Sequence, residues 1–302
     1  IFFIFFVEKK NESGIFKTSL KKKIKLKLLD ILSLSLEDKS IFMISITPYN
    51  FIIYQFIKLF NKKVSGFVYL RSDGYKEYSI KYGYFGRIIY HFFFESILKN
   101  LKLITVSKNL SNISKHKPLR IYPSEIDNEW RKNLKKINSK KANLFYLGRI
   151  KKEKGIFSLL DLVNKLTIDF NLDIVGMDKI KRSKNKKVHY HLETSKKKKI
   201  IKFFDKNNIF ILPSYTEGYP KVVLESLSRL RPVIIFKEIS HVKSSFKGIF
   251  ISKRNSKSLQ KTIIFILNNY IKIQKSMKKN KIPTKINFQT NLKNLIKRNH
   301  RC

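Results

Sequence analysis

Short apolar runs alternate with amphipathic stretches through the C-terminal half of the chain, and this alternation restricts the fold more than any other feature. The expected strands are residues 143–147, 172–175, 209–212, 233–236 and 249–251, and the expected helices are residues 155–166, 196–204, 221–230 and 258–270. Strands that alternate with helices at this spacing predict a parallel sheet with helices on both faces.

The N-terminal half repeats the pattern less regularly. Strands are expected at residues 2–7, 41–46, 67–70 and 103–106, and helices at residues 16–32, 51–60, 86–100 and 107–115. We therefore expect an α/β protein of two Rossmann-like, doubly wound domains that face a cleft, with ligands at the carboxyl ends of the strands. The N-terminal domain is placed at residues 1–138 and the C-terminal domain at residues 139–272. A basic tail at residues 273–302 is expected to pack back on the N-terminal domain.

Charge gives less information about function than its size suggests. Lysine and arginine number 65 against 21 aspartates and glutamates, so the formal net charge is +44, a value typical of nucleic-acid-binding proteins. The basic residues are mostly lysines that accompany abundant Ile, Asn and Phe, and Ala142 is the only alanine, as codon bias in an AT-rich genome would produce. We predict no nucleic-acid partner, and retain an attraction to anionic membrane surfaces and phosphorylated ligands.

Cysteine content and the length of the apolar runs bear on the compartment. Cys302 is the single cysteine, which excludes a disulfide framework and a cysteine-based metal site. The apolar runs stay below the ~18 residues of a membrane span, and the first seven residues lack the features of a signal peptide. A cytoplasmic protein is expected. Peripheral attachment to the inner face of the cytoplasmic membrane is an additional hypothesis. Residues 16–32 and 84–98 have the profile of an interfacial helix, and packing on the protein's own sheet is the alternative.

The most specific segment is FILPSYTEGYPKVVLESLSRL at residues 210–230. A buried strand leads into a tight loop, and Pro220 is expected as the first residue of a helix, where the N–H that proline lacks has no partner. The amides of Gly218 and Tyr219 then remain free at a positive helix end, which binds phosphate or sugar oxygens readily.

Two carboxylates accompany this helix start. Ionised carboxylates only accept hydrogen bonds and suit paired sugar hydroxyls, so Glu217 is a candidate to contact a transferred sugar and Glu225 a ribose diol. The alternative for Glu225 is an exposed salt-bridged face, because Lys221, Glu225 and Arg229 follow an i, i+4, i+8 spacing.

LFYLGRIKKEKG at residues 144–155 is the second candidate segment. A strand ends at Gly148, and the cations that follow, Arg149 and Lys154, can neutralise a leaving diphosphate. The alternative is that both are ordinary cations of a lysine-rich chain, an interpretation that we accept for Lys151 and Lys152.

These segments resemble the retaining glycosyltransferases of family 4 (glycosyl transferases group 1), which have the GT-B fold. The C-terminal domain of that family reads strand-GR-x-x-x-x-KG, a strand ending in VG, LPS-x-x-EG-x-P-x-x-x-x-E and PVI. This sequence has LGRIKKEKG, DIVG, LPSYTEGYPKVVLE and RPVI in that order, over about residues 143–270. The resemblance implies that Arg149 and Lys154 bind the donor diphosphate, that Glu217 lies beside the donor sugar and that Glu225 binds ribose.

The N-terminal half carries a weaker form of the same resemblance. Ser13-Gly14 resembles the family's glycine-rich loop, with one glycine where two are common, and IYPSEID at residues 121–127 resembles its PNG-x-D loop. Asp73 and Glu77, in RSDGYKEY, are candidates to bind an acceptor, with a buried or salt-bridged acid as the alternative. The expected donor-binding set is Gly14, Gly148, Arg149, Lys154, Glu217, Gly218, Tyr219 and Glu225, and Glu217, Arg149 and Lys154 are also expected to be catalytic.

The function that the resemblance implies is transfer of a sugar from a nucleotide diphosphate-sugar to a hydroxyl acceptor, saccharide or lipid-linked, with retention at the anomeric carbon. It implies synthesis of cell-surface polysaccharide or lipopolysaccharide, with no metal or other cofactor. The alternatives are a nucleotide-sugar epimerase on the same fold, and a non-catalytic basic protein that binds membranes or nucleic acid. The joint presence of Arg149, Lys154, Glu217 and Glu225 argues against the second alternative.

Overall fold

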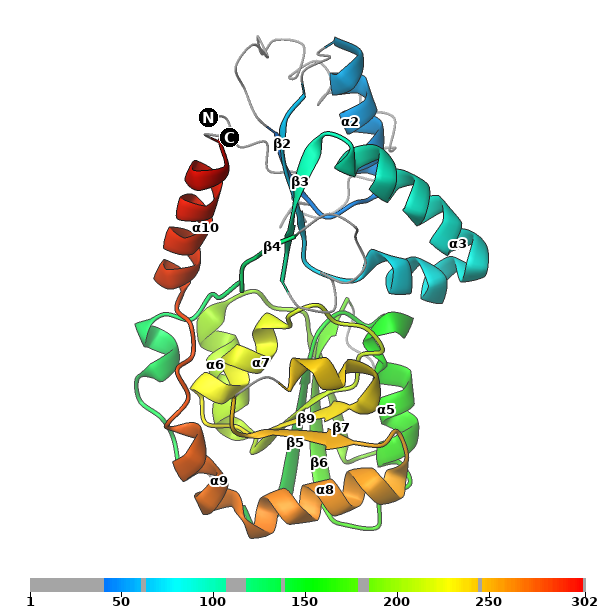
Figure 1. Cartoon of the computed structure of the whole chain (residues 1–302). Coiled ribbons are helices and arrows are strands. Elements are labelled where there is room, and N and C mark those ends of the chain that lie inside the picture. Colours follow the sequence, from blue (N-terminus) through cyan, green and yellow to red (C-terminus); the bar gives the residue numbers. More distant parts are fainter. Residues whose placement is uncertain are drawn as a thin grey trace. The chain divides into compact units, whose positions relative to one another are not determined.

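Two parallel sheets organise the computed structural model, which describes residues 41–60, 64–106, 118–136, 139–178, 185–243 and 246–300 (Figure 1). The chain divides into one unit made of Ile1–Ile121 with Lys293–Cys302 and a second unit made of Tyr122–Leu292. The elements expected at residues 2–7, 16–32 and 107–115 lie outside the described residues, as does Gly14.

The N-terminal sheet has the strand order β1-β2-β3-β4, and all neighbouring strands are parallel. Its strands are β1 (Ile41–Ile44), β2 (Gly66–Leu70), β3 (Leu101–Thr105) and β4 (Leu119–Arg120), and its helices are α2 (Pro48–Phe60) and α3 (Gly74–Leu98). Strand β2 is buried along its whole length, as expected for a parallel strand covered on both faces. Both helices contribute side chains to the core beside the sheet.

Helix α3 is longer than the sequence pattern predicts and bends within its length. Asp73 caps its start, because Oδ1 accepts a hydrogen bond from the amide of Lys76 at 3.1 Å. The bend is at Gly83, whose φ of 65° lies in the left-handed region that glycine adopts without strain, and Figure 1 shows the two segments running in different directions. Beyond the bend, Tyr90 and Phe94 are buried. The exposed apolar side chains of the same helix, which we call the aromatic face of α3, are Tyr82, Tyr84, Phe85, Ile88, Ile89 and Phe92.

The C-terminal sheet has the strand order β10-β9-β8-β5-β6-β7, and its strands are again parallel. The strands are β5 (Ala142–Leu147), β6 (Phe170–Met177), β7 (Val188–Leu192), β8 (Ile209–Leu212), β9 (Val233–Phe236) and β10 (Ile249–Ser252). Strands β8 and β9 are buried at every position, which explains why their sequences are uninterrupted apolar runs.

The sheet reverses its direction of growth between β5 and β8. The chain passes from β5 to β6 and β7, then returns to place β8 on the other side of β5, where Leu144 pairs with Ile209 and Phe145 with Phe210. At such a switch point the loops that follow the two strands lead to opposite sides, and ligands bind between them. The loops after β5 and β8 are therefore the place to look for a site.

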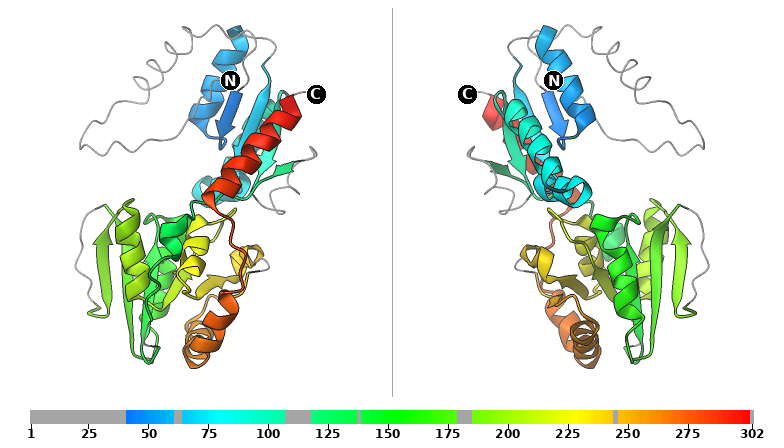
Figure 2. Two further views of the ribbon diagram at one scale, coloured as in Figure 1. Left: turned by 90° about the vertical axis from the view of Figure 1, so that its left-hand side faces the viewer. Right: turned by 90° about the vertical axis from the view of Figure 1, so that its right-hand side faces the viewer.

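Helices cover both faces of this sheet. They are α5 (Ile156–Val163), α6 (Lys197–Lys206), α7 (Lys221–Ser228), α8 (Ser256–Asn268) and α9 (Tyr270–Met277), with short 3-10 helices η1 (Asn128–Arg131), η2 (Lys152–Lys154) and η3 (Lys237–Val242). Helix α5 lies on one side of β5 and β6, and α6 and α7 lie on the other (Figure 1). Strand β7 and the α8–α9 pair lie at opposite ends of the C-terminal unit (Figure 2). Helix α10 (Lys285–His300) follows in sequence.

Two buried arginines hold the polar stretch that precedes β5. Arg229 and Arg231 are each 1% exposed and donate hydrogen bonds to backbone carbonyls between Trp130 and Lys135. Nη2 of Arg229 also lies 2.7 and 2.8 Å from the two carboxylate oxygens of Asp205. Because buried guanidinium groups need complete pairing, this arginine clamp ties the residues before β5 to α6 and α7.

The clamp yields a stability prediction. Arg229→Met keeps most of the side-chain volume but leaves three carbonyls without their buried donor and Asp205 with only the 3.6 Å contact to Arg231. It should therefore lower the free energy of unfolding by about 3–5 kcal/mol. The control is Arg131→Met, which removes an exposed arginine with one hydrogen bond, to the carbonyl of Ile282 at 2.8 Å, and should cost less than about 1 kcal/mol. Urea denaturation measures both, and equal losses in the two variants would contradict the role of the clamp.

Candidate active site

The switch point brings the two motif segments together. Glu217 lies in the loop after β8, and Lys154 ends the 3-10 helix that follows β5. Nζ of Lys154 is 2.7 Å from Oε1 of Glu217, and the two side chains are only 22% and 12% exposed. The hydroxyl of Ser214 donates to the same Oε1 at 2.7 Å. Two of the expected catalytic residues therefore form a largely buried, charge-assisted pair.

Two glycines make this approach possible. Gly155 has a φ of 66°, and a Cβ there would lie 1.9 Å from the carbonyl oxygen of Pro213. Gly176 has a φ of 135°, and a Cβ there would lie 1.9 Å from the carbonyl oxygen of Gly148. Only residues without a side chain fit such backbone contacts, which gives the KG and VG of the sequence motifs a steric reason.

Arg149 lies at the same edge of the sheet but is placed differently from Lys154. It directly follows Gly148 at the end of β5, and its side chain is exposed. Its backbone carbonyl accepts a hydrogen bond from the hydroxyl of Tyr146 at 2.9 Å. Among the described residues its guanidinium forms no ion pair, so it is available to a ligand.

Backbone amides are unpaired just before α7, as expected, but the position of Pro220 differs from the prediction. Pro220 is extended, with φ −73° and ψ 113°, and precedes the helix instead of forming its first residue. Within the described part of the chain, the amides of Gly218 and Tyr219 have no hydrogen-bond partner. The ring of Tyr219 packs against Tyr122, with centroids 5.1 Å apart, and burial raises the pKa of its hydroxyl above the usual value.

Glu225 is not part of the salt-bridged helix face that its spacing allowed. Lys221 instead pairs with Glu125 at 2.8 Å, and Arg229 is buried against Asp205. The Glu225 carboxyl has no hydrogen bond or ion pair among the described residues. Burial raises its pKa to about 7, an effect that Lys221 opposes and Glu125 adds to. A largely buried carboxyl without a partner is available for ligand hydroxyls.

Asp73 and Glu77 belong to the N-terminal unit. Asp73 is occupied as the N-cap of α3, and its backbone carbonyl accepts a hydrogen bond from the amide of Glu77 at 3.0 Å. Both side chains are partly exposed. Between them in the sequence, Tyr75 contacts Nδ1 of His91 through its hydroxyl at 2.8 Å. Asp73 therefore has a structural role as a helix cap. Binding of the acceptor substrate by Asp73 and Glu77 stays a prediction.

Three residues that reinforce the site were not singled out from the sequence. Ser214 binds Glu217 directly, and its position in the LPS motif was the available signal. Nε2 of His241 lies 2.8 Å from the backbone oxygen of Glu217, and because a carbonyl only accepts, this nitrogen donates. Arg254 packs beneath the loop that carries Ser214, and no local pattern indicates this role.

Neither a cluster of metal ligands nor a membrane-spanning helix occurs among the described residues. These residues contain no group of three or more His, Cys, Asp or Glu side chains that could hold a metal ion. In the same part of the chain, no helix has the length and apolar character needed to cross a bilayer.

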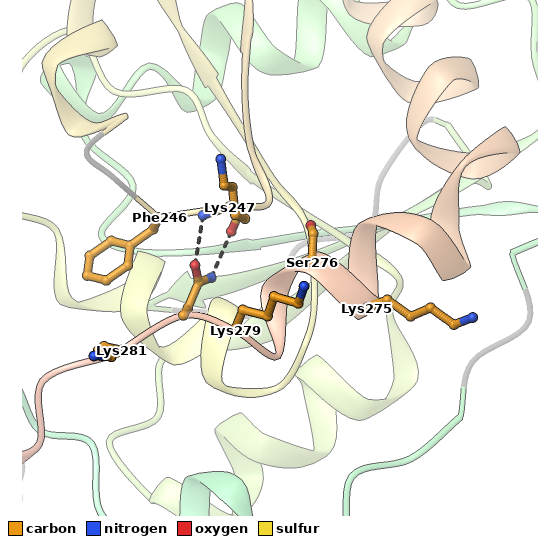
Figure 3. A pocket seen from close by; sticks show the side chains of 7 residues that line it. Phe246, Lys247, Lys275, Ser276, Lys279 and Lys281 are labelled. Carbon is orange, nitrogen blue, oxygen red and sulfur yellow. Dashed lines mark hydrogen bonds between the residues drawn. The ribbon is translucent and has the colours of Figure 1, made fainter.

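A cavity of about 560 Å³ lies elsewhere in the C-terminal unit, between the turn before β10 and the end of α9 (Figure 3). Its neutral polar groups already have partners, because the side chain of Asn280 binds the backbone of Lys247 at 2.8 and 2.9 Å and Ser276 donates to the carbonyl of Ile273. Exposed lysines supply the rest of its polar lining, and Lys247 and Lys275 point in different directions in Figure 3. The cavity has no converging groups that would define a ligand, and it is not the candidate site.

Comparison with known proteins places the C-terminal unit in a family. Residues 127–283, more than half of the chain, match the family model described as "Glycosyl transferases group 1". The "Putative teichuronic acid biosynthesis glycosyltransferase TuaC" of Bacillus subtilis is 30% identical over 121 residues, which cover 39% of this chain and 31% of that protein. A second relative is the "N,N'-diacetylbacillosaminyl-diphospho-undecaprenol alpha-1,3-N-acetylgalactosaminyltransferase" of Campylobacter jejuni. It is 22% identical over 205 residues, covering 65% of this chain and 53% of that protein. The chain thus spans about a third to a half of the length of these relatives.

Likeness to solved structures extends over nearly the whole chain. HepE from Anabaena, solved in complex with UDP and glucose, has a TM-score of 0.69 at 11% identity, with 94% of this chain and 84% of that chain covered. At this identity the likeness shows the fold alone. It confirms the expected α/β class with the two Rossmann-like sheets of the GT-B type.

The unpaired carboxyl of Glu225 predicts a pH-dependent stability. Its pKa rises from 4.5 to about 7 in the folded protein, so its contribution to stability is complete below pH 4.5 and is lost as the pH rises through 7. Glu225→Gln stays neutral at every pH. Relative to wild type, this variant should therefore gain up to about 3 kcal/mol in unfolding free energy between pH 4.5 and pH 8.

Urea denaturation across this pH range measures the effect. Glu129→Gln removes a partly exposed carboxylate that pairs with Lys197 and controls for the loss of one negative charge. The prediction fails if wild type and Glu225→Gln show parallel pH profiles.

Proposed function

Because the chain belongs to the glycosyl transferases group 1 family and is therefore a glycosyltransferase, we propose that it transfers a sugar from a nucleoside diphosphate sugar to a hydroxyl acceptor. The observation that carries this proposal is the buried Lys154–Glu217 pair at the switch point of the C-terminal sheet. It sets a cation and a carboxylate side by side, next to amides that are open among the described residues. The proposed setting is the synthesis of cell-surface polysaccharide or lipopolysaccharide, which the name of the Bacillus relative supports.

The proposal gives each charged group one task. In the ligand-free protein, Glu217 neutralises the ammonium of Lys154. A bound donor replaces this pairing, because its diphosphate takes Lys154 and Arg149 as partners and the freed Glu217 carboxylate accepts hydrogen bonds from the sugar hydroxyls. Glu225 holds the ribose diol. The amides of Gly218 and Tyr219 bind diphosphate or sugar oxygens at the start of α7.

Transfer is proposed to proceed with retention and without a metal ion. The acceptor oxygen bonds to the anomeric carbon on the face from which the diphosphate leaves, and the acceptor proton passes to a diphosphate oxygen. The bond between the anomeric carbon and the diphosphate breaks as negative charge grows on the leaving group. Lys154 and Arg149 stabilise this charge, which is the task that a divalent cation has in other transferases.

The donor base and the acceptor are proposed from the relatives. HepE is solved with UDP and glucose, so we propose a UDP-sugar as the donor. The name of the Campylobacter relative includes a diphospho-undecaprenol, so we propose a lipid-linked saccharide as the acceptor. A lipid-linked acceptor places the reaction at the inner face of the cytoplasmic membrane and requires the enzyme to attach there peripherally.

The aromatic face of α3 is the surface that supports such attachment. Tyr84, Phe85 and Phe92 are 74%, 76% and 63% exposed, a clustering of large apolar side chains that is uncommon on a surface facing only water. Exposed cations, Lys81 and Arg87, lie on the same helix and add attraction to anionic head groups. Tyrosine and phenylalanine beside cations suit the interfacial layer of a bilayer. The other candidate from the sequence, residues 16–32, lies outside the described residues.

The donor site predicts distinct effects of its charged residues. Lys154→Ala and Arg149→Ala should each weaken UDP binding roughly 10- to 100-fold, because each removes a charge-assisted contact of about 1.5–3 kcal/mol. Glu217→Gln should lower kcat on the order of 100-fold while UDP binds as well or more tightly, because Lys154 loses its competing partner. Calorimetry with UDP and transfer assays in the presence of EDTA measure these quantities.

Lys151→Ala removes an exposed neighbouring lysine and is expected to change neither quantity. Unchanged UDP affinity in both cation variants would contradict the roles of Lys154 and Arg149 in binding the donor diphosphate. Activity that EDTA abolishes and magnesium restores would contradict the metal-free mechanism. Conversion of the donor in the absence of any acceptor would favour the epimerase alternative.

The aromatic face predicts membrane binding that depends on two side chains. The wild-type protein should float with vesicles of phosphatidylcholine containing 30% phosphatidylglycerol at low salt. The double variant Phe85→Ala/Phe92→Ala should bind at least about tenfold more weakly, since each buried phenylalanine contributes about 1.5–3 kcal/mol. The matched control is Phe157→Ala/Phe265→Ala, which removes two phenylalanines of the C-terminal unit that are 55% and 53% exposed. Equal flotation of both double variants would show that α3 is not the attachment surface.

A further inference from the structure

Arg254 is the most constrained cation beside the candidate site. It follows β10, and its side chain is only 15% exposed. Cζ of the guanidinium lies over two aromatic rings, 4.0 Å from the centroid of Tyr215 and 4.5 Å from that of Phe236. Nε donates to Oε1 of Glu238 at 2.6 Å, and Nη2 donates to the carbonyl oxygen of Ser214 at 3.4 Å. One side chain thus joins the segments that follow β8, β9 and β10.

The same guanidinium also packs against the turn that follows Lys154. A Cβ built on Gly155 would lie 3.3 Å from Nη1 of Arg254. Nη1 is buried and has no hydrogen-bond partner among the described residues. Arg254 therefore fills the space beneath both loops that leave the switch point.

Two hydrogen bonds, one between backbone atoms and one between side chains, connect the residues around Arg254 to the Lys154–Glu217 pair. The amide of Tyr215 donates to the carbonyl of Glu153 at 3.0 Å, which joins the loop after β8 to the residue before Lys154. Ser214, whose carbonyl accepts from Arg254, uses its hydroxyl to bind Glu217. Both members of the Lys154–Glu217 pair are thus one residue or one hydrogen bond away from atoms that Arg254 contacts.

The geometry argues against Arg254 as a direct ligand of the donor. Two aromatic rings lie against its guanidinium, Nε and Nη2 are committed within the protein, and Nη1 is buried against the Gly155 turn. Only a planar cation can stack on two rings and donate in its own plane at the same time, which the tetrahedral ammonium of lysine cannot do.

We propose that Arg254 is a positioning residue for sugar transfer, which sets the relative placement of Lys154 and Glu217 by locking the Ser214–Tyr215 backbone against the Gly155 turn. The inference rests on the proposed function, because it assigns the pair a part in transfer. Loss of Arg254 lets the two loops separate, and the carboxylate and ammonium no longer meet the donor in one geometry.

A double-mutant cycle tests the proposal. Arg254→Met keeps an unbranched side chain of somewhat smaller volume without the charge or the planar donor group, and should lower kcat at least about tenfold at a temperature where the variant remains folded. In a Glu217→Gln background the same change should lower kcat less than about threefold, because the residue acts through the one already removed. Arg254→Lys should behave like Arg254→Met, and Lys253→Met, next to it and exposed, should have no effect. A full tenfold loss in both backgrounds, or no loss in either, would overturn the proposal.

Hydrogen exchange of the ligand-free protein gives a second measurement that does not depend on activity. Arg254→Met should speed exchange at the amide of Tyr215 at least about fivefold, because its bond to Glu153 opens more often, while Lys253→Met should not. Glu238→Gln, a milder change, should produce part of the effect. Unchanged exchange would overturn the positioning role even in an active enzyme. Faster exchange in a chain that transfers no sugar would instead count against the proposed function alone.

Discussion

The contact between the Gly155 turn and the carbonyl of Pro213 is the constraint on which the candidate active site depends. A Cβ at Gly155 would lie 1.9 Å from that oxygen, so the two loops that leave the switch point meet backbone to backbone. This approach brings Lys154, one residue before the glycine, to within 2.7 Å of Glu217, four residues after the proline. The order of the strands places β5 beside β8, and the missing side chain lets their loops close into one site.

In a chain of net charge +44, burial helps to identify the few cations that the fold positions. Exposed lysines are numerous on the helices and loops and say little about function. Arg229 and Arg231 are nearly inaccessible and clamp the residues before β5, while Arg254 packs against the rings of Tyr215 and Phe236. Lys154 is largely buried and pairs with the carboxylate of Glu217 in the loop after β8. Desolvating a cation is unfavourable unless it is paired, so burial identifies cations that the fold positions. Arg149 is exposed and is a candidate because of its place at the end of β5.

The functional features of the two units differ in kind. In the C-terminal unit, strands β8 and β9 are buried throughout, and the loop after β8 presents Ser214, Glu217 and the open amides before α7. The N-terminal unit has its most distinctive feature on a surface, where α3 buries Tyr90 and Phe94 on one face and exposes Phe85 and Phe92 on another. A core explains the first face. The second has a physical reason only if something apolar covers it.

Periodicity and glycine spacing are local properties, so they predicted the α/β class, five of the six strands of the C-terminal sheet, and Lys154, Glu217 and Gly218 as site candidates. They did not predict the edge strand β7 or the helices α9 and α10, whose short or polar sequences have weak apolar periodicity. Helix α3 was predicted with the wrong start, since the break at Gly83 hid its first turns. Three features of the site follow from contacts between distant segments. Glu225 lacks the ion pairs that its helical spacing allowed, Lys154 meets Glu217, and Arg254 packs against both loops. These outcomes depend on strand order and on which distant segments come into contact, and local sequence patterns do not encode either.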